Sequence, residues 1–184
     1  MTNWRNSYLP GCDSVGYDDS ESFHRAAANN NWEVELCEGS FFQTDDGVLH
    51  MLLRSNTNYL WQSDSDDDGQ TWSEPRQTRF TDSKSKFHCG RLPDGRFFCI
   101  GNPDFTSAIP RSPLVISLSS NGRDFNQRVV LGCQNYKLKY EGLHKGGDFG
   151  YPHSIIHNNA LWIIVSRYKE AIQILKVPLS GLAL

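Results

Sequence analysis

The chain has 184 residues, of which 38% are hydrophobic, 12% aromatic and 21% charged, and its formal net charge is −3. A length within roughly 100–200 residues fits one domain with its own core, and this aromatic content excludes a disordered chain. The 18 Lys and Arg residues are outnumbered by 21 Asp and Glu residues, so there is no basic field for nucleic-acid binding.

The N-terminal region differs in pattern from the rest of the chain. An acidic run precedes the alanine-rich stretch 22–28, which is typical of the first turn of a short helix. We therefore assign residues 1–31 to an N-terminal extension with a short helix, and residues 32–184 to the main domain. The extension lacks the apolar segment of a secretory signal, and no stretch reaches the ~18 apolar residues of a membrane-spanning helix. The compartment stays unknown.

From residue 32 onward, short apolar segments alternate with turns. The strongest turns are Asp45-Asp46-Gly47, Asp94-Gly95 and Asn158-Asn159. Such turns between apolar segments predict β-hairpins. Each hairpin is followed by one or two further strand candidates, which gives units of about 40–50 residues, the size of a four-stranded β-propeller blade. An ordinary antiparallel sandwich is the alternative that this spacing leaves open.

The cysteines and glycines exclude several kinds of site. The five cysteines are an odd number without a Cys-x-x-Cys pair, so we expect neither a structural zinc site nor a disulfide framework. Cys37 and Cys99 lie in apolar segments, which predicts two buried thiols. The chain has no dinucleotide fingerprint and no phosphate-binding loop, so we expect no cofactor and no metal.

Segment 65–72 has the form Ser-x-Asp-x-Gly-x-Thr-Trp. The motif is carried by Ser65, Asp67, Gly69, Thr71 and Trp72. Here the Asp and Ser side chains can bind turn amides, the Gly supplies a positive φ, and the Trp fills the space below the turn. A second copy at 118–125 keeps the glycine and an aromatic residue but loses the Ser and Asp. Calcium binding by the acidic run is the alternative, and the Gly and Trp spacing favours the turn.

With this motif, the sequence resembles the sialidases and related Asp-box, or BNR-repeat, β-propellers. The resemblance lies in the order of polar residues: Glu38 opens a strand pair, Arg54 ends the following strand, Arg111 comes after the motif, and Tyr151 begins the last strand pair. It implies an all-β fold of about three four-stranded blades from a six-bladed propeller. We therefore expect the C-terminal part of a larger enzyme, with unpaired strand edges through which it can associate.

The resemblance also implies the chemistry of the site. Sialic acid carries a carboxylate on its anomeric carbon, which arginines bind through bidentate hydrogen bonds. By the family pattern these arginines are Arg54 and Arg111. Sialidases use a tyrosine as nucleophile, here Tyr151, and a phenol needs a base, which the pattern assigns to Glu38. Each of the four also has a structural alternative, as a strand-end, loop or core residue.

The sequence departs from the family at two points. A third arginine and the acid/base aspartate are not recognisable, because residues 1–35 offer no candidate within a strand pattern. Segment 144–153 gathers titratable side chains on a glycine-rich loop, unlike an ordinary sialidase. We assign His144, Lys145 and His153 of this loop to substrate binding.

We expect a sialidase-like glycoside hydrolase that removes terminal sialic acid, or a related acidic sugar, from glycans. We expect its active site to be incomplete in this chain. One alternative is a non-catalytic glycan-binding or structural propeller segment. Another is a glycosidase or lyase for a different acidic sugar, centred on the glycine-rich loop. A glycan or an acidic sugar is the expected partner. The missing aspartate and arginine leave open whether the chain is an enzyme.

Overall fold

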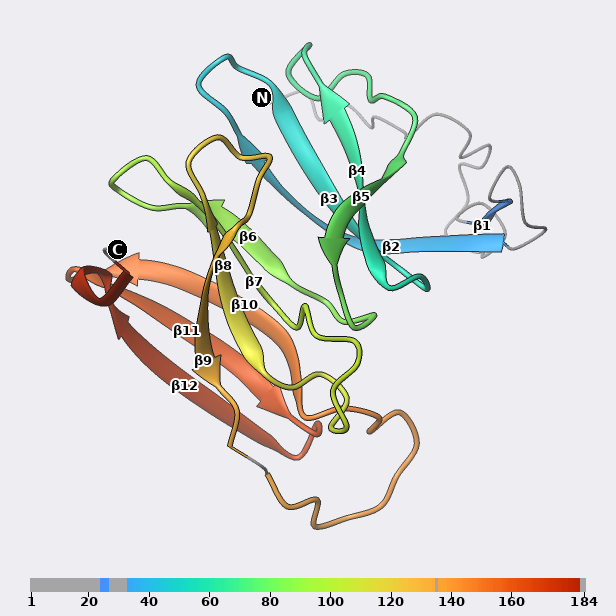
Figure 1. The fold of residues 1–184 in the computed structure, drawn as a ribbon, viewed down its shortest axis with the longest axis vertical. Helices are drawn as coiled ribbons and strands as arrows, with labels where there is room; N and C mark the ends of the chain where they lie inside the picture. The colour runs from blue at the N-terminus through green and yellow to red at the C-terminus, as the bar shows by residue number, and fades with distance from the viewer. Residues whose placement is uncertain (1–23, 27–32, 135, 183–184) are drawn as a thin grey trace, which may run out of the picture. The chain divides into compact units, whose positions relative to one another are not determined.

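The computed structural model describes residues 24–26, 33–134 and 136–182 (Figure 1). The chain divides into two compact units, residues 1–79 and 80–184. The described residues form three β-sheets and one short 3-10 helix, so the fold is all-β as predicted. Within these residues, no helix is sufficiently long and apolar to cross a bilayer.

The first unit contains a sheet whose strands are neighbours in chain order. The strands are β1 (His24–Ala26), β2 (Glu33–Gln43), β3 (Leu49–Ser55), β4 (Tyr59–Ser65) and β5 (Arg76–Thr81). The predicted turn at residues 45–47 joins β2 to β3, and Gly47 there has a φ of 85°. Val34, Leu36 and Leu53 are buried together and form one core cluster of this unit.

The helix predicted over residues 22–28 is not formed at its centre. His24–Ala26 are strand β1, paired antiparallel with residues 33–35 of β2. A short isolated helix is marginal, and pairing with a longer strand outweighs the local helix preference of alanine. The remaining residues of the predicted helix lie outside the described part of the chain.

The second unit contains a four-stranded and a three-stranded antiparallel sheet, both again in chain order. The first has β6 (His88–Arg91), β7 (Phe97–Gly101), β8 (Leu114–Ser119) and β9 (Gln127–Gly132), and the second has β10 (Phe149–His157), β11 (Ala160–Arg167) and β12 (Ala171–Pro178), followed by the 3-10 helix η2 (Leu179–Leu182). One apolar cluster joins the two sheets, with Ile100 and Ile116 from the first and Leu161 and Ile163 from the second. Successive sheets of this kind are the pattern of propeller blades.

The two hairpin turns predicted in this unit are confirmed. Gly95 has a φ of 91° between β6 and β7. Asn158 and Asn159 have φ values of 48° and 54° between β10 and β11, as a two-residue turn of type I′ requires.

The cysteine prediction is half correct. Cys99 is buried as predicted, whereas Cys37 is exposed. Successive side chains of a strand point to opposite faces, and Val34 and Leu36 take the buried positions of β2. Cys37 therefore falls on the open face.

Candidate functional site

Glu38 lies in a β-bulge of β2. The pairing register between β2 and β3 shifts between Cys37 and Ser40, and Glu38 has a φ of 45°. A bulge bends its strand and redirects a side chain. Nη1 of Arg54 on β3 donates a hydrogen bond of 2.5 Å to Oε2 of Glu38, and both side chains are half-buried. The first unit thus brings together two of the predicted site residues.

Tyr151 also lies in a β-bulge. The register between β10 and β11 shifts between Gly150 and His153, and Tyr151 has a φ of 56°. Pro152 is tolerated here because a bulge leaves its position without a required N–H partner. The Tyr151 side chain is 41% exposed, and the Lys169 ammonium lies 5.9 Å from its ring centroid. The phenol is therefore accessible at the start of a hairpin, beside a positive charge.

Arg111 lies beside the start of β10. Its carbonyl accepts a hydrogen bond of 3.2 Å from the amide of Phe149, and it has a φ of 59°. Its guanidinium Nη1 would lie 3.5 Å from a Cβ built on Gly150, the residue before Tyr151. The second unit therefore brings the predicted arginine and the predicted nucleophile segment together.

Three of the four residues predicted as clamp, nucleophile and base share an unusual backbone. Glu38, Arg111 and Tyr151 all have a positive φ. A side chain with a Cβ is disfavoured in this region, which costs of order 1–3 kcal/mol for each residue. Such conformations cluster at active sites and ligand clamps, and bulges are enriched beside active sites.

His153 is exposed and contacts a second histidine. Its ring centroid lies 4.4 Å from that of His88 on β6. Burial of His88, followed by the nearby His153 and Lys86, lowers the pKa of His88 to about 4. Two imidazoles alone do not make a metal centre, and the described part of the chain contains no group of three or more His, Cys, Asp or Glu side chains placed to hold an ion.

Lys145 stabilises the loop between β9 and β10. Its Nζ donates hydrogen bonds to Oε1 of Glu170 at 2.9 Å and to the carbonyl of Tyr140 at 2.7 Å. Glu170 also accepts the amides of Lys139 and Tyr140. Desolvation raises the pKa of Glu170, but the hydrogen bonds from Lys145 and the two amides outweigh it and lower this pKa to about 2.

His144, the third loop residue assigned to substrate binding, is exposed next to Lys145 and has a φ of 64°. Substrate binding by His144, Lys145 and His153 stays a prediction.

Asp148 and Arg167 are important residues that the sequence did not assign. Asp148 is fully buried, and Arg167 binds both of its carboxylate oxygens, at 2.6 Å through Nε and 2.8 Å through Nη2. The guanidinium also lies 4.0 Å from the ring centroid of Phe149. The sequence signal for this ion pair is a charged residue of opposite sign at each end of the β10–β11 hairpin. Asp148 directly precedes Phe149, and Phe149 is paired with Arg167.

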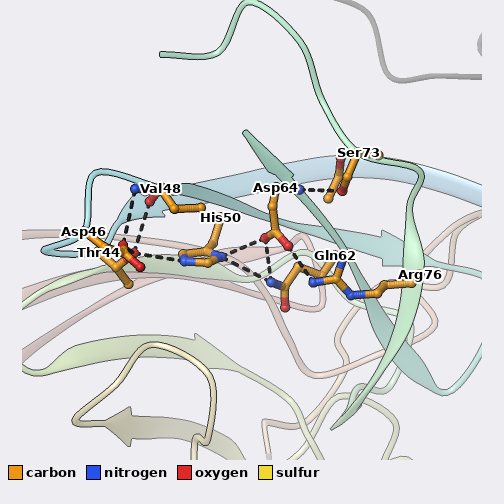
Figure 2. A network of polar contacts seen from close by, with 9 residues as sticks. Thr44, Asp46, Val48, His50, Gln62, Asp64, Ser73 and Arg76 are labelled. Carbon is orange, nitrogen blue, oxygen red and sulfur yellow. Dashed lines mark hydrogen bonds and ion pairs between the residues drawn. The ribbon is translucent and has the colours of Figure 1, made fainter. Parts of the chain in front are cut away.

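A second polar network lies in the first unit (Figure 2). His50 is buried on β3, and its Nδ1 lies 2.7 Å from Oδ1 of Asp64 on β4, which also accepts Gln62 and Arg76. The other ring nitrogen of His50 lies 3.0 Å from Oγ1 of Thr44. These contacts join the β2–β3 turn to β4 and β5. They are internal to the sheet, so we assign this network to stability.

The turn at residues 65–72 has the predicted hydrogen bonds. Oδ1 of Asp67 accepts from the Thr71 amide and the Ser65 hydroxyl, both at 2.8 Å, and the Gly69 amide donates to Ser65 at 2.9 Å. Gly69 has a φ of 79°. The half-buried Trp72 lies within van der Waals distance of a Cβ built on Gly69.

The second copy of this turn retains more than the sequence indicated. Ser119 donates to Oδ1 of Asn121 at 2.9 Å, and this oxygen also accepts the amides of Arg123 and Asp124. The prediction that this copy loses the Ser is therefore wrong. Ser119 and Asn121 take the roles of Ser65 and Asp67, in a turn with one residue fewer before its aromatic residue Phe125.

Comparison with solved structures supports the fold at low sequence identity. A leech intramolecular trans-sialidase, complexed with 2,7-anhydro-Neu5Ac, has 13% identity and a TM-score of 0.58 over 84% of this chain and 26% of its own. The intramolecular trans-sialidase from Ruminococcus gnavus has 16% identity and a TM-score of 0.55 over 85% and 37%. The α-L-arabinofuranosidase Arb93A from Fusarium graminearum has 16% identity and a TM-score of 0.51 over 78% and 45%.

These likenesses concern the fold, and the chain spans less than half the length of each of these structures. No curated protein matches the sequence significantly. The model of the BNR repeat-like domain family matches residues 14–164, which is most of the chain. The chain belongs to the BNR repeat-like domain family.

Proposed function

We propose that the chain contributes to the active site of a glycoside hydrolase that releases terminal sialic acid, or a related acidic sugar, from glycans. The observation that carries this proposal is the backbone of the two candidate catalytic residues. Glu38 and Tyr151 each lie at a positive-φ bulge in the first strand of a hairpin. A fold tolerates that cost most readily where a side chain must be held in one direction. The turn at 65–72 serves as the Asp-box.

The arginines suit a carboxylate-bearing sugar. Arg111 approaches the residue before Tyr151, so a carboxylate bound by its guanidinium would be held beside the phenol. Glu38 orients Arg54, and the order of motifs along the chain assigns Arg54 to carboxylate binding. Bidentate arginine–carboxylate pairs give both affinity and geometric selectivity. A neutral sugar would gain little from them.

The proposed reaction has two displacements. Oη of Tyr151 attacks the anomeric carbon, its proton passes to a carboxylate base, and the bond to the departing glycan oxygen breaks. The order of motifs along the chain assigns the role of base to Glu38. A general acid donates a proton to that oxygen, and we assign no described residue to this role. Water then attacks the anomeric carbon of the tyrosyl–sugar intermediate and gives a proton to the deprotonated general acid. The protonated base returns its proton to the departing tyrosyl oxygen, which restores the phenol and releases free sialic acid.

A glycan-binding role without hydrolysis is the second candidate. In the first unit, the Glu38 carboxylate is hydrogen-bonded to Arg54. A carboxylate that only orients an arginine serves binding equally well. In that case Tyr151 contributes contact area and no bond-forming step.

Hydrolysis and binding assays on the full-length protein separate these functions. We expect release of the fluorophore from an α-sialoside, with fluorogenic uronides and α-L-arabinofuranosides as a panel for other sugars. Tyr151→Phe should abolish turnover while retaining sialic acid binding, measured by saturation-transfer NMR. Arg54→Ala and Arg111→Ala should each weaken binding about tenfold or more, the loss of one charge-assisted pair. Binding without turnover in the wild type favours the second candidate, and turnover unaffected by Tyr151→Phe contradicts the assignment of the nucleophile.

A further inference from the structure

The Arg111 side chain lies directly on the backbone of Gly147. A Cβ built on Gly147 would lie 2.5 Å from Cδ, 2.7 Å from Cγ and 3.0 Å from Cβ of Arg111. Distances this short are not tolerated between carbon atoms. Gly147 is buried and has no positive φ that would otherwise require glycine. The aliphatic part of Arg111 therefore occupies the space where a side chain at position 147 would lie.

The main chain on either side of this contact is fixed. The Asp148 amide donates to the carbonyl of Pro110 at 2.9 Å, and the Phe149 amide donates to the carbonyl of Arg111 at 3.2 Å. Nδ2 of Asn102 donates to the same Arg111 carbonyl at 2.8 Å. Two segments distant in sequence are thus joined at the position where Arg111 adopts its positive φ.

Asp148 anchors this arrangement from the interior. Its side chain is fully buried, and Arg167 binds both carboxylate oxygens. The Asp148 carbonyl accepts the amide of Tyr168 at 2.8 Å, which attaches it to the end of β11. A buried ion pair with two direct hydrogen bonds holds its backbone more firmly than an exposed pair. The residue beside Gly147 is consequently held by a fixed hairpin.

We infer that Gly147 and Asp148 are positioning residues for the Arg111 guanidinium. Gly147 leaves the space in which the aliphatic part of the Arg111 side chain lies. Asp148 attaches the backbone next to Gly147 to the end of β11. Together they direct Nη1 of Arg111 toward Gly150 and the start of the Tyr151 bulge. The inference rests on the proposed function only in giving Arg111 a carboxylate ligand. The packing arrangement itself is independent of any substrate.

The test compares neighbouring glycines. Gly147→Ala places a methyl group against Arg111, whereas a Cβ built on Gly146 has no atom within 4 Å, so Gly146→Ala is the matched control. We expect Gly147→Ala to displace the Arg111 side chain and raise its rate of modification by phenylglyoxal several-fold, measured by peptide mass spectrometry. The affinity of the Gly147→Ala variant for sialic acid should fall about tenfold. Gly146→Ala should match the wild type in both measurements.

A double-mutant experiment keeps the inference testable if Gly147→Ala folds poorly. Removing the clashing side chain should relieve the strain, so Gly147→Ala with Arg111→Ala should unfold at a higher temperature than Gly147→Ala alone. Arg167→Lys, which retains the charge but not the two-point contact, should also raise Arg111 modification. Equal Arg111 reactivity in the Gly147→Ala and Gly146→Ala variants, or no rescue in the double variant, overturns the inference. Absent sialic acid binding in the wild type overturns only the proposed function, because the modification and unfolding measurements still decide the positioning.

Discussion

Asp67 holds the turn at residues 65–72 through charge-assisted hydrogen bonds. The amide of Thr71, then its hydroxyl and the hydroxyl of Ser65, lower the pKa of Asp67 to about 2. A carboxyl group with a lowered folded-state pKa stabilises the fold above its unfolded pKa and loses this contribution as the pH falls through the folded value. The stabilisation by Asp67 is therefore complete above about pH 4 and disappears toward pH 2.

We expect Asp67→Asn to lower the unfolding temperature at pH 6 and to have a much smaller effect near pH 2. The asparagine can keep the contacts made by one oxygen, as Asn121 does in the second turn. It loses the charge and the second acceptor, to which the Thr71 hydroxyl donates at 2.7 Å. Thermal unfolding followed by circular dichroism between pH 2 and pH 7 measures the difference. A constant difference across this range contradicts the assignment to the charged form.

The sequence located these residues because their roles are local. The spacing of Ser65, Asp67 and Gly69 specifies a turn within eight residues, and the structure has those hydrogen bonds. The roles of Asp148 and Arg167 depend on a pairing across a hairpin and could not be found by local spacing. The same holds for Gly147, whose importance lies in the side chain of a distant residue.

At the level of strands, the polar network of the first unit joins neighbouring strands through specific side-chain contacts. His50, Asp64 and Arg76 come from β3, β4 and β5, and their contacts link these three strands (Figure 2). Desolvation raises the pKa of Asp64, but the hydrogen bonds from Gln62, His50 and Arg76 outweigh it and lower this pKa. Asp64 is therefore charged in the folded state, and its contribution is lost on acidification.

Replacing Asp64 should destabilise the first unit. Asp64→Ala leaves the buried His50 nitrogen without its acceptor, and an unsatisfied buried polar group costs about 1–3 kcal/mol. Asp66, which is exposed in the adjacent turn, provides the matched control Asp66→Ala. Denaturant unfolding at neutral pH measures both variants. Equal free energies of unfolding for the two variants would contradict the assignment of this network to stability.

The strand bulges explain why motif order was informative although the exact geometry was not predictable. Glu38 and Tyr151 were selected by their order along the chain, and the structure places both in bulges with a positive φ. A bulge depends on the register with the partner strand, which no single segment encodes. The helix expected at residues 22–28 shows the reverse case. There the local pattern was outweighed by pairing with β2.

At the level of the whole molecule, sheet number and strand order followed from turn spacing. Hairpins that recur in units of about 40–50 residues predict consecutive sheets, and three sheets occur in the described residues. Spacing did not predict that the last sheet is apolar on both faces. Ile163 and Val165 of β11 are buried with residues of β7–β9, while Ile155 and Ile174 on the opposite face are 61% and 65% exposed.

This open face should be detectable as an apolar patch. It surrounds a hollow of about 380 Å³ whose lining includes Ile155, Trp162, Ile164 and Ile174. Large contiguous apolar surfaces are uncommon on folded monomeric proteins, and they bind dyes such as anilinonaphthalene sulfonate. We expect the folded chain to enhance the dye's fluorescence at neutral pH. Ile155→Thr with Ile174→Thr should reduce this enhancement by more than half, because threonine keeps the β-branched shape and removes apolar area.

Leu143→Thr is the control for this measurement, since Leu143 is 89% exposed on the loop before β10 and does not line the hollow. Circular dichroism must show the same strand content in all variants, so that dye binding reports the native surface. Because both isoleucines contribute to one face, their effects on dye binding should exceed that of Leu143→Thr even though Leu143 is more exposed. Equal effects would mean that the dye responds to total exposed apolar area. A larger effect of the two isoleucines places the dye on the β10–β12 face, where their side chains form one surface across paired strands.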